Sequence, residues 1–243
     1  MIIYGINAVL EALRAGRVRE LRVGAREGGR MQEVLSLAGE RGVRVRRVPP
    51  EALDRDARHG VHQGVVAIIE HARDYALDEL LRGAGGPPLL IVLDGIEDPH
   101  NLGAILRTAD AAGVDGVVIQ SRRAAPLGGA AAKASAGAVA HVRIARVVNI
   151  ARTLDELKTA GVWSVGLAAG AATLYDAVDF TLPTAIVLGA EGAGLRRLVR
   201  ERCDVLAAIP LGGHVDSLNV SVAAGVALFE AVRQRRQRRS GAG

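Results

Sequence analysis

Three segments of the chain combine polar side chains with glycines in a way that suits a binding or reaction site. They are Asp94–Ala109, Val187–Leu195 and Ile209–Ala224, and their polar side chains include Asn101, Arg107, Glu191, Ser217 and Asn219. A guanidinium can grip a phosphate or carboxylate through a planar fork of donors, and a nearby carboxylate can fix its orientation. These residue types therefore suit the binding of an anionic or polar substrate.

Each segment lies at the carboxyl end of a stretch that we expect to be a β-strand. Leu89–Leu93 is a continuous apolar run of the kind found in strands buried on both faces, and the other two strands are predicted at Ala185–Gly189 and Val205–Pro210. Parallel sheets bind their ligands at the carboxyl ends of the strands. We therefore expect the three segments to meet at one edge of a sheet.

The elements that must position these segments alternate between strands and helices. Further strands are predicted at Gly116–Gln120, Val142–Val147 and Trp163–Ala168. Helices are predicted at roughly 101–112, 129–136, 150–160, 195–201 and 217–239. Such alternation indicates an α/β domain with a mostly parallel sheet that helices cover on both faces.

The N-terminal third is predicted to be a smaller α/β unit. Its predicted helices are Asn7–Leu13, with Asn7 as the N-cap, and Met31–Arg41. Its predicted strands are Leu21–Val23, Val43–Val48 and Gln63–Glu70, of which Val43–Val48 alternates apolar and basic residues like a half-exposed strand.

Over residues 72–87, charges, glycines and proline interrupt the sequence patterns typical of helices and strands. We interpret this stretch as a linker. The predicted domains are therefore residues 1–71 and residues 88–243.

Composition narrows the class of protein. Hydrophobic residues make up 49% and charged residues 23%, as in globular domains. The net charge of +5 weakly favours a polyanionic partner, but 2% aromatic residues are too few for a surface built on base stacking. The single cysteine, Cys203, excludes an internal disulfide and a cysteine-cluster metal site. No signal peptide or bilayer-length apolar run is visible, so we expect a cytoplasmic protein.

Common catalytic motifs are absent from the sequence. It has no glycine-rich dinucleotide fingerprint, no P-loop, no H-E-x-x-H and no G-x-S-x-G. Its six histidines show no spacing typical of metal ligands, and His59 and His62 are expected in a surface loop. We therefore predict no metal site.

Each singled-out residue also has a purely structural interpretation. Asn101 could cap its helix, Arg107 could be a solvated helix residue, and Ser217 and Asn219 could begin a helix. Glu191 could be a surface carboxylate in a plain glycine turn. The order and spacing of all the segments together favour a functional interpretation.

The three segments resemble the three motifs of the SpoU (TrmH) branch of the SPOUT RNA methyltransferases. The first matches N-x-G-x-x-x-R-T-A, the second L-G-x-E-G-x-G, and the third I-P-L followed by S-L-N-V-S-x-A. Tyr4–Val9 and Gln63–Ala67 resemble this family's N-terminal substrate-binding module. The two-domain layout resembles the 23S rRNA guanosine-2′-O-methyltransferases that act on the peptidyl-transferase region.

The resemblance implies a fold, partners and a cofactor. Residues 88–243 are expected to form an α/β SPOUT domain with a parallel sheet and a deep trefoil knot. Residues 1–71 are expected to form an RNA substrate-binding domain similar to a ribosomal-protein fold. The implied partners are RNA and a second copy of the chain, and the implied methyl donor is S-adenosylmethionine, with no metal. The residues implied around this cofactor are Leu188, Gly189, Gly194, Ile209, Leu211 and Leu218.

The resemblance also implies methylation of a ribose 2′-hydroxyl, with Arg107 in the central role. Asn101 and Asn219 would orient Arg107 or the ribose, Glu191 would fix the guanidinium, and Ser217 would assist near the same ribose. Arg107 either accepts the hydroxyl proton or stays charged, clamps a phosphate and stabilises the developing alkoxide. Because the pKa of a guanidinium exceeds about 12, we favour the second role.

Basic residues outside the motifs suit RNA docking. They are Arg44, Arg46 and Arg47 on one predicted strand, and Arg122 and Arg123 after another. The densest basic cluster is the tail Arg233–Arg239. This tail either docks RNA or is a solvated helix end that the helix dipole favours.

Two other classes of function stay open. An enzyme of the same fold could methylate a tRNA guanosine, or an rRNA adenosine whose methylation confers antibiotic resistance. A protein of the same fold could bind RNA or assist ribosome assembly without catalysis. The N-terminal module disfavours tRNA, and the joint presence of Asn101, Arg107, Glu191 and Asn219 disfavours a non-catalytic protein.

Overall fold

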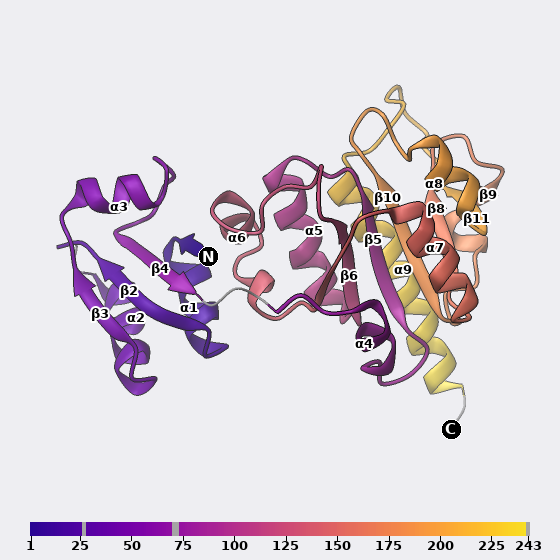
Figure 1. The fold of residues 1–243 in the computed structure, drawn as a ribbon. Coiled ribbons are helices and arrows are strands. Elements are labelled where there is room, and N and C mark those ends of the chain that lie inside the picture. Colours follow the sequence, from indigo (N-terminus) through magenta and orange to yellow (C-terminus); the bar gives the residue numbers. More distant parts are fainter. Residues whose placement is uncertain (26–27, 70–72, 242–243) are drawn as a thin grey trace. The chain divides into compact units, whose positions relative to one another are not determined.

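The structure is a computed structural model that describes residues 1–25, 28–69 and 73–241 (Figure 1). The chain divides into two compact units. The first comprises residues 1–72, 99–107 and 125–141, and the second comprises residues 73–98, 108–124 and 142–243. The predicted domain boundary at residues 71 and 72 lies outside the described residues, as does Glu70 at the end of a predicted strand.

The second unit is built on a seven-stranded sheet in the order β7-β6-β5-β10-β8-β11-β9, and every pairing in it is parallel. The predicted α/β fold with a parallel sheet is therefore confirmed. The trefoil knot stays a prediction. The strands are β5 (Leu89–Asp94), β6 (Gly116–Gln120), β7 (Ile144–Val147), β8 (Trp163–Leu167), β9 (Thr173–Leu174), β10 (Thr184–Gly189) and β11 (Val205–Ala208). Only the two-residue β9 lacks a counterpart among the predicted strands.

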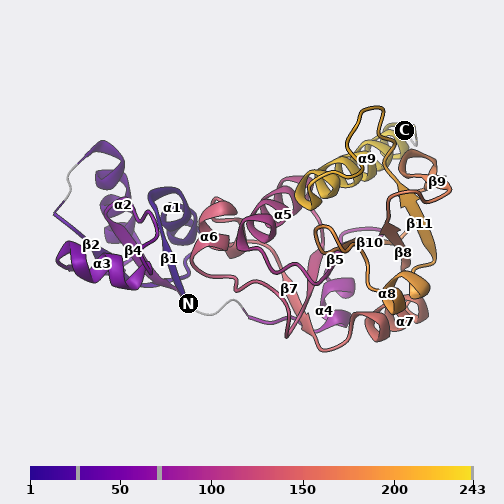
Figure 2. The ribbon, with the colours of Figure 1, turned by 90° about the horizontal axis from the view of Figure 1, so that it is seen from above.

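Helices cover both faces of this sheet. Figure 2 shows α9 (Val220–Ser240) on one face and α4 (Leu77–Arg82), α7 (Ile150–Thr159) and α8 (Arg197–Arg202) on the other. Alternate strand residues such as Leu90 and Val92 pack in one apolar cluster with Leu80, Leu154 and Val199 from these three helices. Burying each such side chain contributes roughly 1.5–3 kcal/mol. This two-sided burial explains why β5, β6 and β10 are continuous apolar runs.

Helix α4 corrects the interpretation of residues 72–87 as a linker. Leu80 of α4 is fully buried against the sheet, and Asp74 forms an isolated parallel bridge with Ile144. The carboxylate of Asp74 also accepts a hydrogen bond from Nε of Arg146 at 3.0 Å. Most of this stretch is thus part of the second unit. The apolar residues that anchor α4 are too few to stand out among the charges around them.

The first unit contains a four-stranded sheet in the order β1-β4-β2-β3. Its strands are β1 (Ile2–Tyr4), β2 (Val18–Val23), β3 (Arg44–Arg47) and β4 (Val65–Ile69), and its helices include α1 (Ile6–Arg14), α2 (Gly29–Glu40) and α3 (Pro50–Asp56). The unit also contains α6 (Ala130–Ala134), η1 (Ala138–Ala140) and the first turns of α5 (Pro99–Ala112). Neither β1 nor α3 was predicted.

Two local predictions in this unit were wrong. Asn7 is not the N-cap of α1, because the helix begins at Ile6 after Gly5, and the backbone N–H of Ile6 donates to Oε1 of Gln63 at 3.0 Å. Strand β3 is exposed along its whole length and not on one face only. It lies at the edge of the sheet and, among the described residues, pairs with β2 alone.

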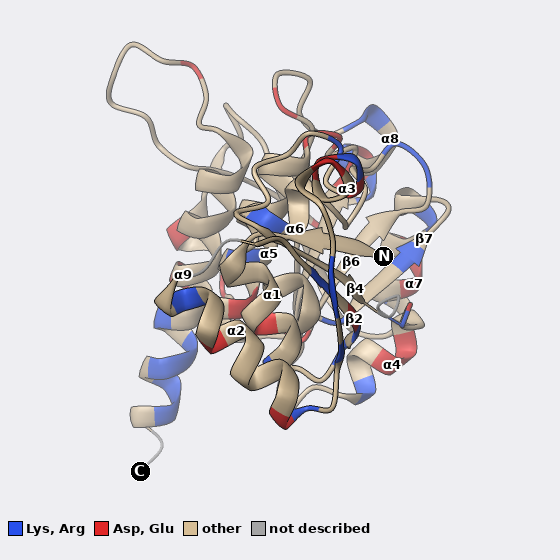
Figure 3. Ribbon diagram, turned by 90° about the vertical axis from the view of Figure 1, so that its left-hand side faces the viewer, with Lys and Arg blue, Asp and Glu red and all other residues tan. Residues whose placement is uncertain are grey.

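The basic tail forms the last turns of α9 (its arginines are blue in Figure 3) and is tied to the sheet's amino edge. The guanidinium of Arg235 donates to the backbone carbonyls of Pro87 at 2.6 Å, Phe180 and Leu182 at 2.9 Å, and Pro88 at 3.0 Å. Neither interpretation of the tail foresaw this structural role. Although α9 has 21 residues, neither it nor any other described helix is long and apolar enough to cross a membrane.

A second polar anchor joins β8 to the start of β11. The carboxylate of Asp204 accepts hydrogen bonds from the N–H and Oγ of Ser164 at 2.9 and 2.8 Å, and from Nζ of Lys158 at 2.7 Å. Burial acts to raise the pKa of Asp204, but the hydrogen bonds from Lys158 and Ser164 outweigh it, so the pKa lies below its usual value. The charged form of Asp204 therefore stabilises the fold.

We expect Asp204→Asn to lower the free energy of unfolding by about 1–3 kcal/mol at pH 7. A carboxyl whose pKa is lower in the folded state stabilises above its unfolded pKa, and this contribution is lost as pH falls through the folded value. The difference between wild type and variant should thus shrink below about pH 4. Chemical denaturation at several pH values measures it.

The matched control is Asp155→Asn, which removes only an exposed ion pair with Arg202. It should change stability by less than about 1 kcal/mol. A gap between wild type and Asp204→Asn that stays constant down to pH 3 would contradict the assignment.

Candidate functional site

A cavity of about 320 Å³ opens at the carboxyl ends of β8, β10 and β11. Its walls come from the end of β8, the loop between β10 and α8, and the segment from β11 into α9. The predicted cofactor residues all line it, namely Leu188, Gly189, Gly194, Ile209, Leu211 and Leu218. The second and third motifs thus meet at the sheet edge where parallel strands present their loops.

The loop after β10 closes tightly on itself. The N–H of Ala190 donates to the carbonyl of Gly194 at 3.1 Å, and the N–H of Gly194 donates back to the carbonyl of Ala190 at 2.8 Å. Gly192 and Gly194 have φ of 75° and 65°, a backbone region that glycine enters without a steric penalty. Glu191 lies in this loop, exposed, and lines the cavity.

Gly189 is required by the close approach of another part of the backbone. A Cβ on Gly189 would lie 2.1 Å from the carbonyl carbon and 2.3 Å from the carbonyl oxygen of Gly194. No side chain fits in this space. The cavity wall beside β10 is therefore made of backbone, whose N–H and C=O groups can recognise a ligand without charged side chains.

An ion pair between the buried Asp94 and the partly exposed Arg196 holds the start of α8 to β5. Asp94 is fully buried, and its carboxylate accepts hydrogen bonds from the backbone N–H of Arg196 at 2.9 Å and from Nε of the same residue at 2.7 Å. This role of Asp94 was not predicted from the sequence. The sequence feature that could have indicated it is a carboxylate directly after a continuously apolar strand, because a charge buried there needs a partner.

Asn219 and Ser217 lie at the entry to α9. Asn219 is the N-cap of the helix, and its Oδ1 accepts hydrogen bonds from the N–H and Oγ of Ser221 at 2.9 and 2.6 Å. Its structural interpretation is therefore right. Ser217 is exposed and lines the cavity together with Val220 and Ala223.

Asn101 and Arg107 both lie on α5. The helix begins at Pro99, so Asn101 occupies its first turn and is not the N-cap; it is only 7% exposed. Arg107 is exposed. Both belong to the segment 99–107, which is grouped with the first unit. Their participation in the site of the second unit stays a prediction.

Comparison with known proteins places the chain in a family. The model of the SpoU rRNA Methylase family matches residues 88–229, and the model for RNA 2'-O ribose methyltransferase substrate binding matches residues 2–75. The chain belongs to the SpoU rRNA methylase family. The cavity, β5, β10 and β11 all lie within the range that the first model matches.

Members of the SpoU family resemble the chain over nearly its whole length. The 23S rRNA (guanosine-2'-O-)-methyltransferases RlmB of Ralstonia nicotianae and Pseudomonas syringae pv. tomato are 49% and 46% identical, over 96% and 98% of this chain and 96% and 97% of their own. The crystal structure of the SpoU methyltransferase AviRb from Streptomyces viridochromogenes, in complex with the cofactor AdoMet, is 27% identical. Superposition of the two structures gives a TM-score of 0.82 and covers 98% of this chain and 91% of AviRb.

The structure adds cavity residues that the SpoU motifs did not single out. They are Arg200 from α8, Asp216 from the loop before α9, and Leu167 at the end of β8 with Ala168 and Ala169 after it. Burial raises the pKa of the Cys203 thiol, at the end of α8, to about 12, which favours the protonated thiol over the reactive thiolate. The described residues contain no group of three or more His, Cys, Asp or Glu that could hold a metal ion.

Proposed function

We propose that this protein transfers a methyl group from S-adenosylmethionine to the ribose 2′-hydroxyl of a guanosine in 23S rRNA. The observation that carries the proposal is the cavity at the carboxyl edge of the parallel sheet, where residues of the second and third SpoU motifs meet. The RlmB relatives support 23S rRNA over tRNA as the substrate class. The substrate-binding match at residues 2–75 supports a large RNA.

The cavity fits the cofactor in size and chemistry. Its volume of about 320 Å³ lies within the range of small-molecule sites, about 300–1,000 Å³. Backbone groups at Gly189, Ile209 and Leu218 would hold the adenosine, with Leu188, Gly194 and Leu211 beside it. Glu191 and Asp216 offer negative charge to a cationic ligand, and Arg200 offers positive charge to its carboxylate. The cofactor supplies a methyl group already activated on a sulfonium.

The residues of the chain must align the 2′-hydroxyl and handle its proton. Arg107 stays charged, binds a phosphate of the RNA and stabilises the oxyanion that develops on the ribose. Glu191 orients the Arg107 guanidinium. Asn101, Ser217 and Asn219 position the ribose or the arginine through hydrogen bonds.

We further propose that the enzyme is a cytoplasmic homodimer. Val222 and Phe229 are one heptad apart on α9 and are 51% and 50% exposed, which leaves an apolar strip on that helix. A second copy of the chain could cover this strip. The strip supports the dimer because two equivalent helices can pack such faces against each other about a twofold axis.

Gly189→Ala should weaken the binding of S-adenosylhomocysteine by at least about tenfold, equal to about 1.4 kcal/mol. The added methyl group would push the loop of Gly194 out of place. Isothermal titration calorimetry measures the affinity. The control is Gly212→Ala, where a Cβ meets open space and binding should be unchanged. Equal affinities for the two variants would contradict the assignment of the cavity.

Arg107→Lys should lower the turnover of 23S rRNA methylation by about 10²–10³-fold, because an ammonium cannot reproduce the planar fork. Single-turnover assays with tritiated S-adenosylmethionine measure the rate. Affinity for RNA should change only a few-fold, since the positive charge remains. Near wild-type turnover at unchanged RNA affinity would exclude both roles considered for Arg107.

Phe229→Asp should shift the protein from dimer to monomer at micromolar concentration, because a desolvated carboxylate opposes burial of the strip. Size-exclusion chromatography with light scattering measures the mass. Arg239→Asp, an exposed substitution near the end of the same helix, should leave the mass unchanged. A wild-type monomer would refute the dimer proposal.

A further inference from the structure

A second basic feature lies at the carboxyl edge of the sheet, in the loop Ser121–Ala124 that follows β6 (the β6 loop). Arg122 and Arg123 in this loop are both exposed. Within the described part of the chain, neither guanidinium has a hydrogen bond or an ion pair. Most other arginines of the second unit are engaged, such as Arg196 with Asp94 and Arg146 with Asp74. Two adjacent cations are thus left for a partner outside the chain.

The backbone holds these two arginines in a defined and strained position. Arg123 has a φ of 58°, in the left-handed region that residues with a Cβ rarely adopt. Ser121 anchors the loop, because its N–H and Oγ both donate to the carbonyl of Val147 at 2.8 and 3.2 Å. Strained non-glycine residues that the surrounding structure holds in place concentrate at binding sites. The β6 loop therefore has the marks of a binding element.

The buried residue before the loop, Gln120, has a side-chain acceptor that lacks a hydrogen bond to any residue that the structure describes. Gln120 is 7% exposed, and its Oε1 is a buried side-chain acceptor without a hydrogen-bond partner among the described residues. An unpaired buried acceptor destabilises the folded chain. Gln120 ends β6, and the strained Arg123 follows within the β6 loop, so this part of the chain carries two features that destabilise the fold.

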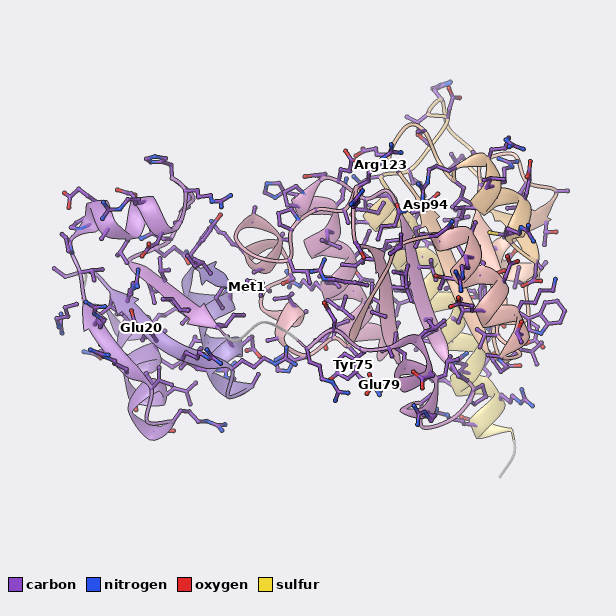
Figure 4. The ribbon with its side chains drawn as sticks, in the orientation of Figure 1. Met1, Glu20, Tyr75, Glu79, Asp94 and Arg123 are labelled. Atoms are coloured by element: carbon purple, nitrogen blue, oxygen red, sulfur yellow. The ribbon has the colours of Figure 1, made fainter. Side chains whose placement is uncertain are left out.

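The β6 loop lies on the same edge as the cofactor cavity. Strand β6 pairs with β5, and β5 pairs with β10, whose loop lines the cavity. Neighbouring strands are about 4.8 Å apart, so β6 is about 10 Å from β10 along the sheet. Figure 4 shows Arg123 at the same end of the sheet as Asp94, the last residue of β5. An RNA strand with its ribose at the cavity can thus pass over the loop.

We propose that Arg122 and Arg123 bind backbone phosphates of the RNA next to the target nucleotide and so set its position over the cavity. This inference rests on the proposed function. Guanidinium forks match phosphate oxygens in geometry and charge. With 2% aromatic residues in the chain, contacts of this kind must provide most of the RNA affinity.

The test is the double variant Arg122→Gln, Arg123→Asn, which removes both charges. Asparagine tolerates the left-handed backbone of position 123, so the loop should keep its shape. The affinity for an unmethylated 23S rRNA transcript is measured at several KCl concentrations. Each lost phosphate contact lowers the slope of log affinity against log salt by about 0.7, so two contacts lower it by about 1.4. Affinity for S-adenosylhomocysteine and the Tm should stay at wild-type values.

The matched control is Arg236→Gln, Arg239→Gln, which removes the same charge from the exposed end of α9. Arg236 and Arg239 line a separate cavity with Pro87 and Leu89, at the amino edge of the sheet. Arg235 ties this tail to the sheet at the edge opposite the cavity, so the control should change the salt slope less than the β6 loop variant does. An unchanged slope in the β6 loop variant, or an equal change in both variants, would overturn the inference. If the wild-type protein fails to methylate the transcript, the proposed function is at fault; if it methylates and the slope is unchanged, only this inference is.

Discussion

The parallel pairing of β5 with β10 is the interaction on which the site depends. Its register sets Gly189 beside Asp94, so the ends of two motifs that are far apart in the chain become neighbours. The buried carboxylate of Asp94 then fixes Arg196 and with it the start of α8. Both strands are buried on both faces, so a slip of this register by one residue would exchange the side chains that pack on the two faces and misplace the cavity.

The cavity beside this pairing is shaped by backbone more than by side chains. Gly189 admits the backbone of Gly194 at a distance that no other residue allows, and the loop between them closes with two reciprocal hydrogen bonds. Such a wall is rigid and polar without being charged. The charged groups Glu191, Asp216 and Arg200 stand around it, where they can meet the charges of a ligand.

The arginines of the chain divide into two kinds once their partners are known. Arg235 holds four backbone carbonyls at the amino edge of the sheet, and burial lowers its pKa below the usual value. Arg122 and Arg123 are exposed at the opposite edge, beside the strands that carry the motifs. A basic pI by itself cannot separate these roles, because it counts structural and ligand-binding cations alike.

Most strands and the motif residues were predictable from the sequence. Strand β6 has the predicted bounds, and the apolar runs of β5 and β10 are visible because burial on both faces demands them. The residues that line the cavity beside β10 and before α9 were named from their motifs. The roles of Asn101 and Arg107 still depend on the resemblance alone.

Other features were decided only by the tertiary structure. The first N–H of α1 is capped by Gln63 from a distant segment, and α4 forms in a stretch with the composition of a linker. Strand β3 is an edge strand whose side chains are exposed on both faces. Local patterns report which side chains must be buried or exposed. They do not report which distant backbone group returns to meet them, because that depends on the path of the whole chain.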